Sequence, residues 1–302
     1  MERILIGPSS FGVADAEPLH RLSAVGYEVL QNRSGRKLSE QELLQMLPGV
    51  VGLVAGLEEL PGRILEQSQL RVISRCGAGV SNVDLDAARR LGITVRNTPD
   101  APTTAVAELT VGAMLALLRH IATTNADLHD GKWIRPLGGQ IEGKTVVIVG
   151  FGRIGRAVAR LLQPFGATLV AVDSDTAARG PLVESANLDE ALARADIVTL
   201  HASGEETILG ERELRLLKPG ALVLHGGRGG QIDEDALCRA LDSGHVTGAW
   251  VDAFRDEPYS GPLTRYPHVL LTPHVGSLTA ECRRRMEREA VDNLLAALHP
   301  RT

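Results

Sequence analysis

Short apolar runs rich in β-branched residues alternate with helical stretches along almost the whole chain. Runs of this kind are typical of strands buried on both faces of a sheet, and helices between them make successive strands parallel. We predict helices over 39–47, 84–91, 104–121 and 279–298. We predict strands over 3–7, 27–30, 51–55, 71–75 and 93–97, then over 145–149, 168–172, 196–200, 221–225, 247–251 and 268–272. The fold class is therefore α/β, with two doubly wound parallel-sheet domains and a cleft between them.

The length, charge and composition of the chain exclude several classes of protein. A chain of 302 residues can hold two α/β domains, and a net charge of -5 without a basic block argues against nucleic-acid and membrane partners. The longest apolar stretch, 109–118, is too short to span a bilayer. The first ten residues do not resemble a signal peptide, and the three cysteines lack metal-site spacing. We expect a cytoplasmic protein without a metal site.

A glycine-rich turn follows the strand at 145–149 and precedes a helix. In this turn Gly150 permits a tight bend, Gly152 lets the backbone approach a pyrophosphate, and Gly155 allows close packing of helix and strand. Asp173 ends the next strand, 18 residues after Gly155, where a carboxylate can accept hydrogen bonds from ribose hydroxyls. The first arginine after Asp173 is Arg179, so no basic residue directly follows this acid, which would repel the 2′-phosphate of NADP. We therefore predict NAD in preference to NADP.

Polar residues follow several predicted strands at the edge where parallel sheets bind ligands. They are Asp173, His201, Arg228, Asp252, Glu257 and His274. Hydride transfer to or from a hydroxy acid needs a forked cation for the carboxylate, a proton carrier and a carboxylate that orients this carrier. Arg228, His274 and Glu257 supply these three groups.

Long motifs in a characteristic order accompany these residues, among them RVISRCGAGVSNVDLDAA, GKTVVIVGFGRIGRAVA, RGGQIDEDAL and LLTPHVG. The chain resembles the D-isomer-specific 2-hydroxyacid dehydrogenases, nearest to the D-3-phosphoglycerate dehydrogenase branch. The resemblance implies that Arg228 binds the substrate, that His274 is the acid/base and that Glu257 pairs with it. The predicted cofactor-binding set is Gly150, Gly152, Arg153, Ile154, Gly155, Asp173, His201, Asp252, Gly276 and Thr104.

The resemblance also implies how the chain divides. A flavodoxin-like substrate domain would comprise residues 1–98 and 276–302, and a Rossmann NAD domain would comprise residues 99–275. The helix that begins near Thr104 resembles the dimerisation helix of relatives, so we expect a homodimer.

The substrate is expected to be a small anionic molecule bound by Arg75, Gly77, Ala78, Gly79, Val80 and Arg135. Arg75 and Arg135 match phosphate-binding arginines of phosphoglycerate dehydrogenases, but Ala55 replaces a further basic residue. His225-Gly226-Gly227 also departs from the more usual Asn-Thr-Ala. The sequence therefore leaves three alternatives. The protein is a dehydrogenase of a substrate like 3-phosphoglycerate, a reductase of hydroxypyruvate or glyoxylate, or a non-catalytic dinucleotide-sensing corepressor.

Overall fold

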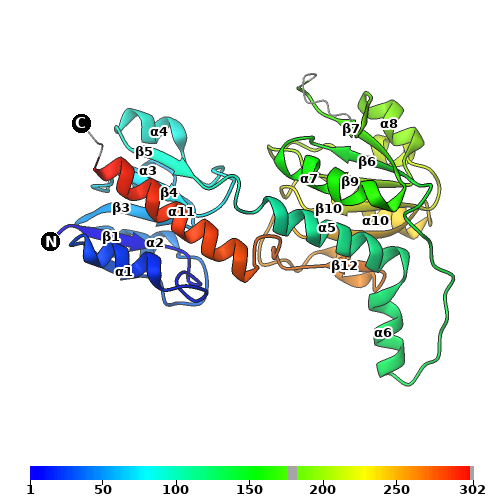
Figure 1. The fold of residues 1–302 in the computed structure, drawn as a ribbon, viewed down its shortest axis with the longest axis horizontal. Helices are drawn as coiled ribbons and strands as arrows, with labels where there is room; N and C mark the ends of the chain where they lie inside the picture. The colour runs from blue at the N-terminus through cyan, green and yellow to red at the C-terminus, as the bar shows by residue number, and fades with distance from the viewer. Residues whose placement is uncertain (176–181, 300–302) are drawn as a thin grey trace. The chain divides into compact units, whose positions relative to one another are not determined.

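The computed structural model describes residues 1–175 and 182–299 (Figure 1). The chain forms two compact units, one of Met1–Pro102 with Ser277–Thr302 and one of Thr103–Gly276. We predicted that the two domains divide after residues 98 and 275, whereas the two units divide after Pro102 and Gly276.

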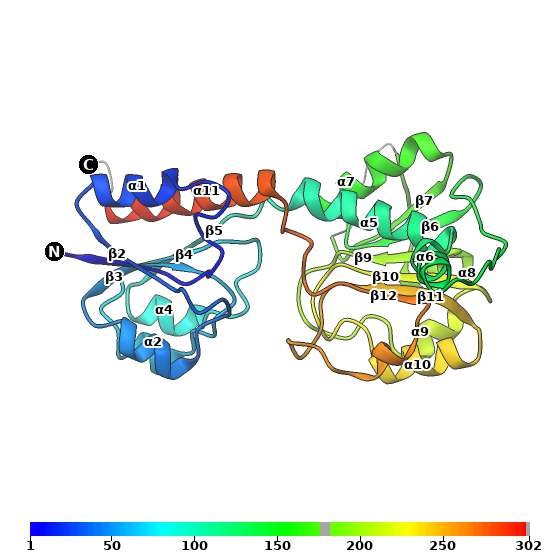
Figure 2. The same ribbon diagram turned by 90° about the horizontal axis from the view of Figure 1, so that it is seen from below.

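The first unit is a five-stranded parallel sheet in the order β2-β1-β3-β4-β5. Helices α1 and α11 cover one face of this sheet and α2 and α4 cover the other, as Figure 2 shows. Its strands are β1 (Arg3–Ile6), β2 (Glu28–Gln31), β3 (Val50–Ala55), β4 (Val72–Arg75) and β5 (Thr94–Asn97). Its helices are α1 (Glu17–Ala24), α2 (Glu40–Met46), α3 (Gly62–Leu65), α4 (Leu85–Arg90) and α11 (Ala280–Leu298).

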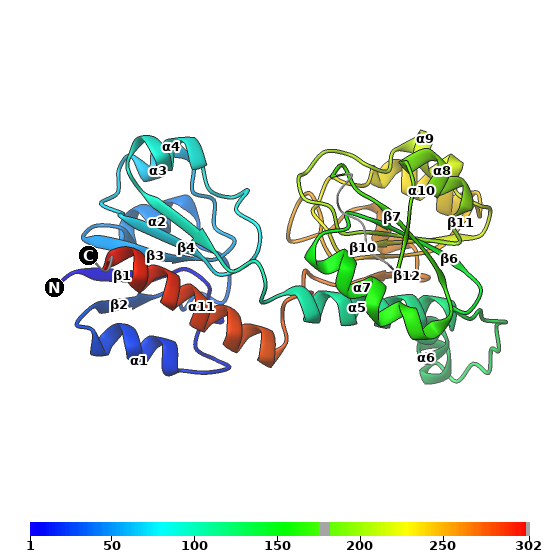
Figure 3. The ribbon, with the colours of Figure 1, turned by 45° about the horizontal axis from the view of Figure 1, so that its top comes forward.

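The second unit is a seven-stranded parallel sheet in the order β12-β11-β10-β9-β6-β7-β8. Helices α5 and α7 pack on one face and α8, α9 and α10 on the other (Figure 3). Its strands are β6 (Thr145–Val149), β7 (Thr168–Val172), β8 (Glu184–Ser185), β9 (Ile197–Leu200), β10 (Ala221–His225), β11 (Val246–Val251) and β12 (Val269–Leu271). Its helices are α5 (Thr103–Leu118), α6 (Ile121–His129), α7 (Arg153–Leu162), α8 (Leu188–Arg194), α9 (Glu211–Leu216) and α10 (Glu234–Asp242), with 3₁₀ turns at Gln163–Phe165 and Pro262–Arg265.

Two parallel sheets, each covered by helices on both faces, confirm the predicted fold class. Strands inside each sheet, such as β1, β3, β6, β9 and β10, are mostly buried because helices pack on both faces, which explains their apolar runs. The edge strands β2, β5 and β8 are partly or fully exposed. Side chains at helix starts also fit their positions, since Asp84, Asn187, Asp233 and Thr279 each accept a backbone N–H of the first turn. All strands of a sheet run the same way, so their carboxyl ends meet along one edge.

The predicted helix over 104–121 is interrupted. α5 ends at Leu118, His120 adopts a left-handed conformation with φ 53°, and a separate helix α6 follows. The sequence did not predict α6, because the break falls on a histidine rather than on glycine or proline. In the described residues no single helix is long and apolar enough to cross a membrane, although α5 and α6, bent by 61°, meet that test together by length and composition.

Candidate functional site

The glycine-rich turn between β6 and α7 leaves a bare backbone in front of the helix. Gly150 has φ 88°, and a Cβ on Gly155 would lie 2.2 Å from the carbonyl oxygen of Gly150. A Cβ on Gly152, in contrast, would meet nothing within 4 Å. The first N–H groups of α7 have no partner within their own helix, so this open position suits an anion such as a pyrophosphate.

Asp173 lies where the sequence predicts, directly after β7. Its Oδ2 accepts the backbone N–H of Phe151 at 2.6 Å, and its Oδ1 accepts that of Asp175 at 2.9 Å. The carboxylate thus ties the end of β7 to the glycine turn while remaining half-buried. Arg179, which the specificity hypothesis also considered, lies outside the described residues.

His201 follows β9 and packs beside the glycine turn, since a Cβ on Gly150 would lie 2.5 Å from the carbonyl carbon of His201. The Nε2 of His201 lies 2.9 Å from Oγ1 of Thr199, and its Nδ1 is buried without a hydrogen-bond partner in the described part of the chain. Burial, with a smaller contribution from the adjacent His225, lowers the pKa of His201 to about 3. The ring is therefore neutral near pH 7.

These features fit a dinucleotide at this edge of the second unit. The open position at Gly152, the start of α7 and the Asp173 carboxylate match the needs of a pyrophosphate and a ribose. The other members of the predicted set lie in the same unit. Arg153 is exposed and Ile154 is half-buried in the first turn of α7, while Thr104 is exposed in the first turn of α5.

His274 and Glu257 form a close pair. The Nδ1 of His274 lies 2.9 Å from Oε1 and 3.0 Å from Oε2 of Glu257, and both side chains are about one-third exposed. Because the carboxylate fixes the Nδ1 side of the ring, Nε2 is the atom that can exchange a proton with a substrate. His274 has φ 53°, and its N–H donates to the carbonyl of Thr272. This costly backbone conformation turns the ring toward Glu257.

The buried carboxylate of Asp252 holds the loop that carries His274. Its Oδ1 accepts the hydroxyl of Thr272 at 2.6 Å and the N–H of Val275 at 2.9 Å, while its Oδ2 accepts the N–H of Gly276 at 2.8 Å. Trp250 completes this network, since its Nε1 donates to Thr272. We predicted Asp252 and Gly276 as cofactor contacts, which remains a prediction. In the structure they position the His274 loop.

Arg228 lies on the loop after β10, and its Nη1 donates to the carbonyl of Gly227 at 3.0 Å. Burial lowers the pKa of Arg228, and the carboxylates of Glu205 and Glu257 counteract that effect. Arg228 is thus close to the acid that pairs with His274. The structure therefore brings the three predicted catalytic side chains to one edge of the second unit.

The predicted substrate loop belongs to the first unit. Gly77 has φ 149° and its N–H donates to Oγ1 of Thr98, while Nδ2 of Asn97 donates to the carbonyl of Ala78 at 2.7 Å. This loop follows β4, and its residues Ala78, Gly79 and Val80 are half-buried. Arg75, the last residue of β4, is half-buried as well, whereas Arg135 lies exposed in the segment after α6.

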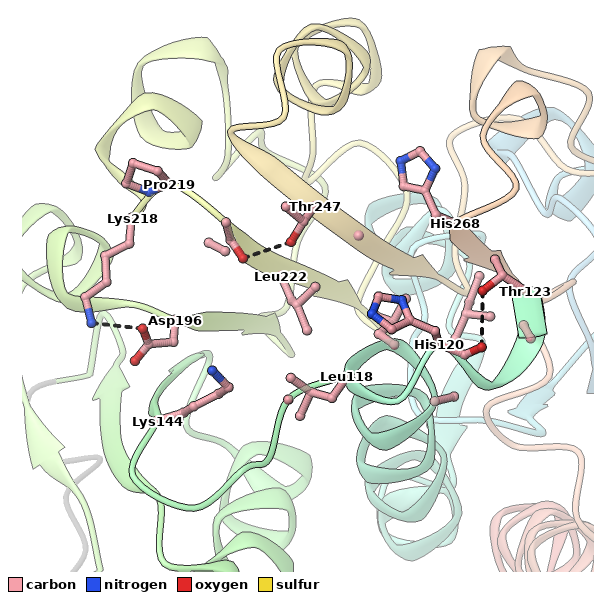
Figure 4. Close-up of a pocket in the computed structure, with 18 of the residues that line it drawn as sticks. Leu118, His120, Thr123, Lys144, Asp196, Lys218, Pro219, Leu222, Thr247 and His268 are labelled. Atoms are coloured by element: carbon pink, nitrogen blue, oxygen red, sulfur yellow. Dashed lines mark hydrogen bonds and ion pairs between the residues drawn. The ribbon is translucent and has the colours of Figure 1, made fainter. Parts of the chain in front are cut away.

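A cavity of about 280 Å³ lies elsewhere in the second unit (Figure 4). Its lining includes residues that precede strands, such as Lys144, Asp196, Lys218 and His268, so it opens at the amino ends of the sheet. The side chains at the carboxyl ends, which carry the chemistry described above, do not line it. Within residues 1–175 and 182–299, no group of three His, Cys, Asp or Glu side chains could hold a metal ion.

Sequence reasoning missed three polar residues that support the site: Thr272, Gln231 and Glu58. Thr272 lies two residues before His274 and Gln231 lies three residues after Arg228, so proximity to predicted site residues could have identified both. Glu58 gave no such signal, because a second glutamate follows it as on an exposed loop.

Comparison with known proteins identifies the family. Residues 111–276 match the model described as D-isomer specific 2-hydroxyacid dehydrogenase, NAD binding domain. The hydroxypyruvate reductase of Thermotoga maritima is 35% identical over 272 residues, which cover 86% of this chain and 89% of that protein. The D-3-phosphoglycerate dehydrogenase of Rattus norvegicus is 36% identical over 275 residues, which cover 87% of this chain but only 51% of that protein.

A crystal structure of a Thermus thermophilus protein superimposes with a TM-score of 0.89 at 35% identity, covering 98% of this chain and 96% of that one. These similarities confirm the predicted family, the use of NAD and the class of enzyme. They do not support the alternative of a non-catalytic corepressor. The chain belongs to the D-isomer specific 2-hydroxyacid dehydrogenase family, and it is an NAD-dependent oxidoreductase of 2-hydroxy acids.

Proposed function

We propose that this enzyme interconverts a small 2-oxo acid and its D-2-hydroxy acid, and that the substrate's tail carries no phosphate or other second strong anion. The observation that carries this choice is the position of Arg75 beside the buried carboxyl group of Glu58. The similarity to a hydroxypyruvate reductase supports the same choice.

Arg75 is committed to the protein itself. Its Nη1 donates to the carbonyl of Cys76, and a Cβ on Gly77 would collide with this guanidinium at 1.8 Å. Ala55 pairs in register with Arg75 across β3 and β4, so the neighbouring strand end contributes no second cation. A phosphate would need at least one arginine whose guanidinium is free to donate two hydrogen bonds to it, and two such arginines would bind it better.

Glu58 places a carboxyl group next to this arginine. It has no exposed surface, its Oε1 accepts the N–H of Gly56 at 2.8 Å, and a Cβ on Gly7 would lie 2.0 Å from that oxygen. Burial raises the pKa of Glu58, and the positive charge of Arg75 opposes this rise. The guanidinium of Arg75 therefore interacts with a carboxyl group of the protein at the strand ends, which leaves it less available to a phosphate.

Catalysis depends on the second unit. NAD, when bound, accepts or supplies the hydride. Arg228 binds the substrate carboxylate and polarises the oxo group, since its planar fork fits two oxygens at once. The Nε2 of His274 gives a proton to the oxo oxygen during reduction and removes the hydroxyl proton during oxidation. Glu257 holds the ring and favours its protonated form.

The deciding experiment follows the absorbance of the reduced cofactor, with NADH and matched pairs of 2-oxo acids. We expect a higher kcat/KM for hydroxypyruvate or glyoxylate than for phosphohydroxypyruvate. A preference for the phosphorylated acid would overturn the proposal and favour the second candidate, a phosphoglycerate-type dehydrogenase, which the rat relative supports.

Two variants test whether Glu58 and Arg75 determine this substrate preference. Glu58→Gln removes the carboxyl group that interacts with Arg75 but keeps its shape, so the kcat/KM ratio of phosphorylated to unphosphorylated acid should rise. Arg75→Met should not impair turnover of the phosphorylated acid selectively. A selective loss would show that Arg75 binds phosphate, contrary to the proposal.

We also propose that the enzyme is a homodimer. The arm, which we define as residues 121–137, has no buried residue in α6 and exposes apolar side chains along its length. Trp133, Ile134 and Leu137 are 80%, 55% and 97% exposed, respectively. An apolar surface of this kind marks an interface, and a second copy is the partner most consistent with the family resemblance. Trp133→Asp with Leu137→Asp should convert a dimer into a monomer in sedimentation velocity, whereas a monomeric parent would contradict the proposal.

A cytoplasmic location is likewise proposed, supported by three free cysteines that are all buried. Cell fractionation would test it, and recovery outside the cytoplasmic fraction would contradict it.

A further inference from the structure

Gln231 joins two loops at the carboxyl edge of the second sheet. Its side chain has no exposed surface. Its Nε2 donates to the carbonyl oxygens of Ala202 at 2.9 Å and Gly204 at 2.8 Å. Its Oε1 accepts the backbone N–H of Arg228 at 3.3 Å. The backbone N–H of Gln231 donates to the backbone carbonyl of Arg228. One buried amide therefore satisfies groups on the loop after β9 and on the loop after β10.

The loop after β9 is in turn packed on the glycine turn. A Cβ on Gly150 would lie 2.3 Å from the nitrogen of Ala202, so no space separates the two backbones. A continuous set of contacts thus runs from the glycine turn through Ala202 and Gln231 to the backbone of Arg228. Buried contacts of this kind move together, because interiors are closely packed.

Gly227 makes room for the amide. A Cβ at this position would lie 2.3 Å from Oε1 of Gln231. The φ angle of Gly227 lies outside the left-handed region, so alanine is compatible with the backbone and only the Gln231 side chain opposes it. Gly227 and Gln231 therefore depend on each other.

We propose that Gln231 is a positioning residue that couples cofactor binding at the glycine turn to the placement of Arg228, so that NADH and the 2-oxo acid bind cooperatively. This inference rests on the proposed role of Arg228 as the group that binds the substrate carboxylate. Gln231 does not touch the substrate. It acts through the two loops that its amide holds together.

The experiment measures the affinity of oxamate, a stable analogue of 2-oxo acids, with and without NADH. In the parent enzyme NADH should tighten oxamate binding. In Gln231→Met, which keeps the volume but lacks the amide, the tightening should fall by about fivefold or more, the lower range of typical coupling between sites. Thr207→Val is the matched control, because it removes only a hydrogen bond to Gly230 on the same loop and should retain the coupling.

A second set of variants tests the role of Gln231 without relying on Gln231→Met alone. Gly227→Ala should displace the intact amide and reduce the coupling as Gln231→Met does. Gln231→Ala removes the obstructing oxygen, so adding Gly227→Ala to it should cost little more. Equal effects of Gly227→Ala in both backgrounds would overturn the assignment, as would full coupling in Gln231→Met.

Failure of the proposed function gives a different result. If Arg228→Met binds oxamate as the parent does, Arg228 is not the carboxylate ligand. If instead Arg228→Met loses oxamate while Gln231→Met retains full coupling, the proposed function stands and the role of Gln231 is wrong.

Discussion

The Nδ1 atom of His274 lies within 3.0 Å of both carboxylate oxygens of Glu257, although 17 residues separate the two along the chain. The contact is possible because β12 brings the chain back beside the loop that follows β11. The pair fixes which imidazole nitrogen remains available for proton transfer, and several outcomes can be expected from this geometry and its surroundings.

Removal of the imidazole should stop the chemistry and spare the cofactor site. His274→Ala is expected to lower kcat by roughly 10²–10⁴-fold, the range for loss of a general acid or base. NADH affinity, measured by fluorescence titration, should change little. Unchanged turnover would exclude His274 from proton transfer.

Replacement of the forked cation should weaken catalysis even when the charge remains. Arg228→Lys is expected to lower kcat/KM by about 10- to 100-fold, because a charge-assisted hydrogen bond to the carboxylate is lost. Steady-state assays with the preferred 2-oxo acid measure this effect. Parent-like values would assign Arg228 to a structural role.

Cofactor choice should depend on Asp173. In Asp173→Ala the negative charge near the ribose disappears, so the NADPH-to-NADH ratio of kcat/KM should rise by roughly tenfold. The glycine turn also loses the acceptor of the Phe151 N–H, so NADH binding should weaken. Asp86→Ala, at an exposed position in the first unit, is the control. A constant ratio would show that Asp173 does not select the cofactor.

Acid should destabilise the fold through His225. Burial lowers the pKa of His225 from 6.5 to about 4, so between these values the unfolded chain binds a proton that the folded protein does not. Folding stability therefore falls as the pH drops through this window, and the cost attributable to this group reaches about 2 kcal/mol at pH 5.

Urea denaturation at pH 7.5 and pH 5 tests this expectation. His225→Asn should lose less stability between the two pH values than the parent does. The exposed His129→Asn should behave like the parent. Equal losses in the parent and His225→Asn would show that another group causes the acid sensitivity.

The local pattern of the chain predicted much of this protein. Runs rich in apolar and β-branched residues identified eleven of the twelve strands found in the described residues, because strands covered on both faces are mostly apolar. β8 was missed because it has two exposed residues and no such run. The polar residues after the strands identified Arg228, Glu257 and His274, since parallel strands must place such residues along one edge.

Contacts between distant segments could not be read in this way. Nothing near Glu58 in the sequence indicates that it lies fully buried beside Arg75, and nothing near Asp252 indicates that it holds the His274 loop. The break at His120 and the exposed arm that follows it were also not predicted.

The sequence by itself therefore determined the α/β class, the glycine turn and the polar residues Arg228, Glu257 and His274 after the strands, because periodicity, glycine and residue type act locally. Only the tertiary structure decided which buried groups satisfy one another, such as Asp252 with Gly276 and Gln231 with Ala202. A buried polar group must find a partner wherever the packed chain supplies one, and that partner is set by the fold rather than by spacing in the sequence.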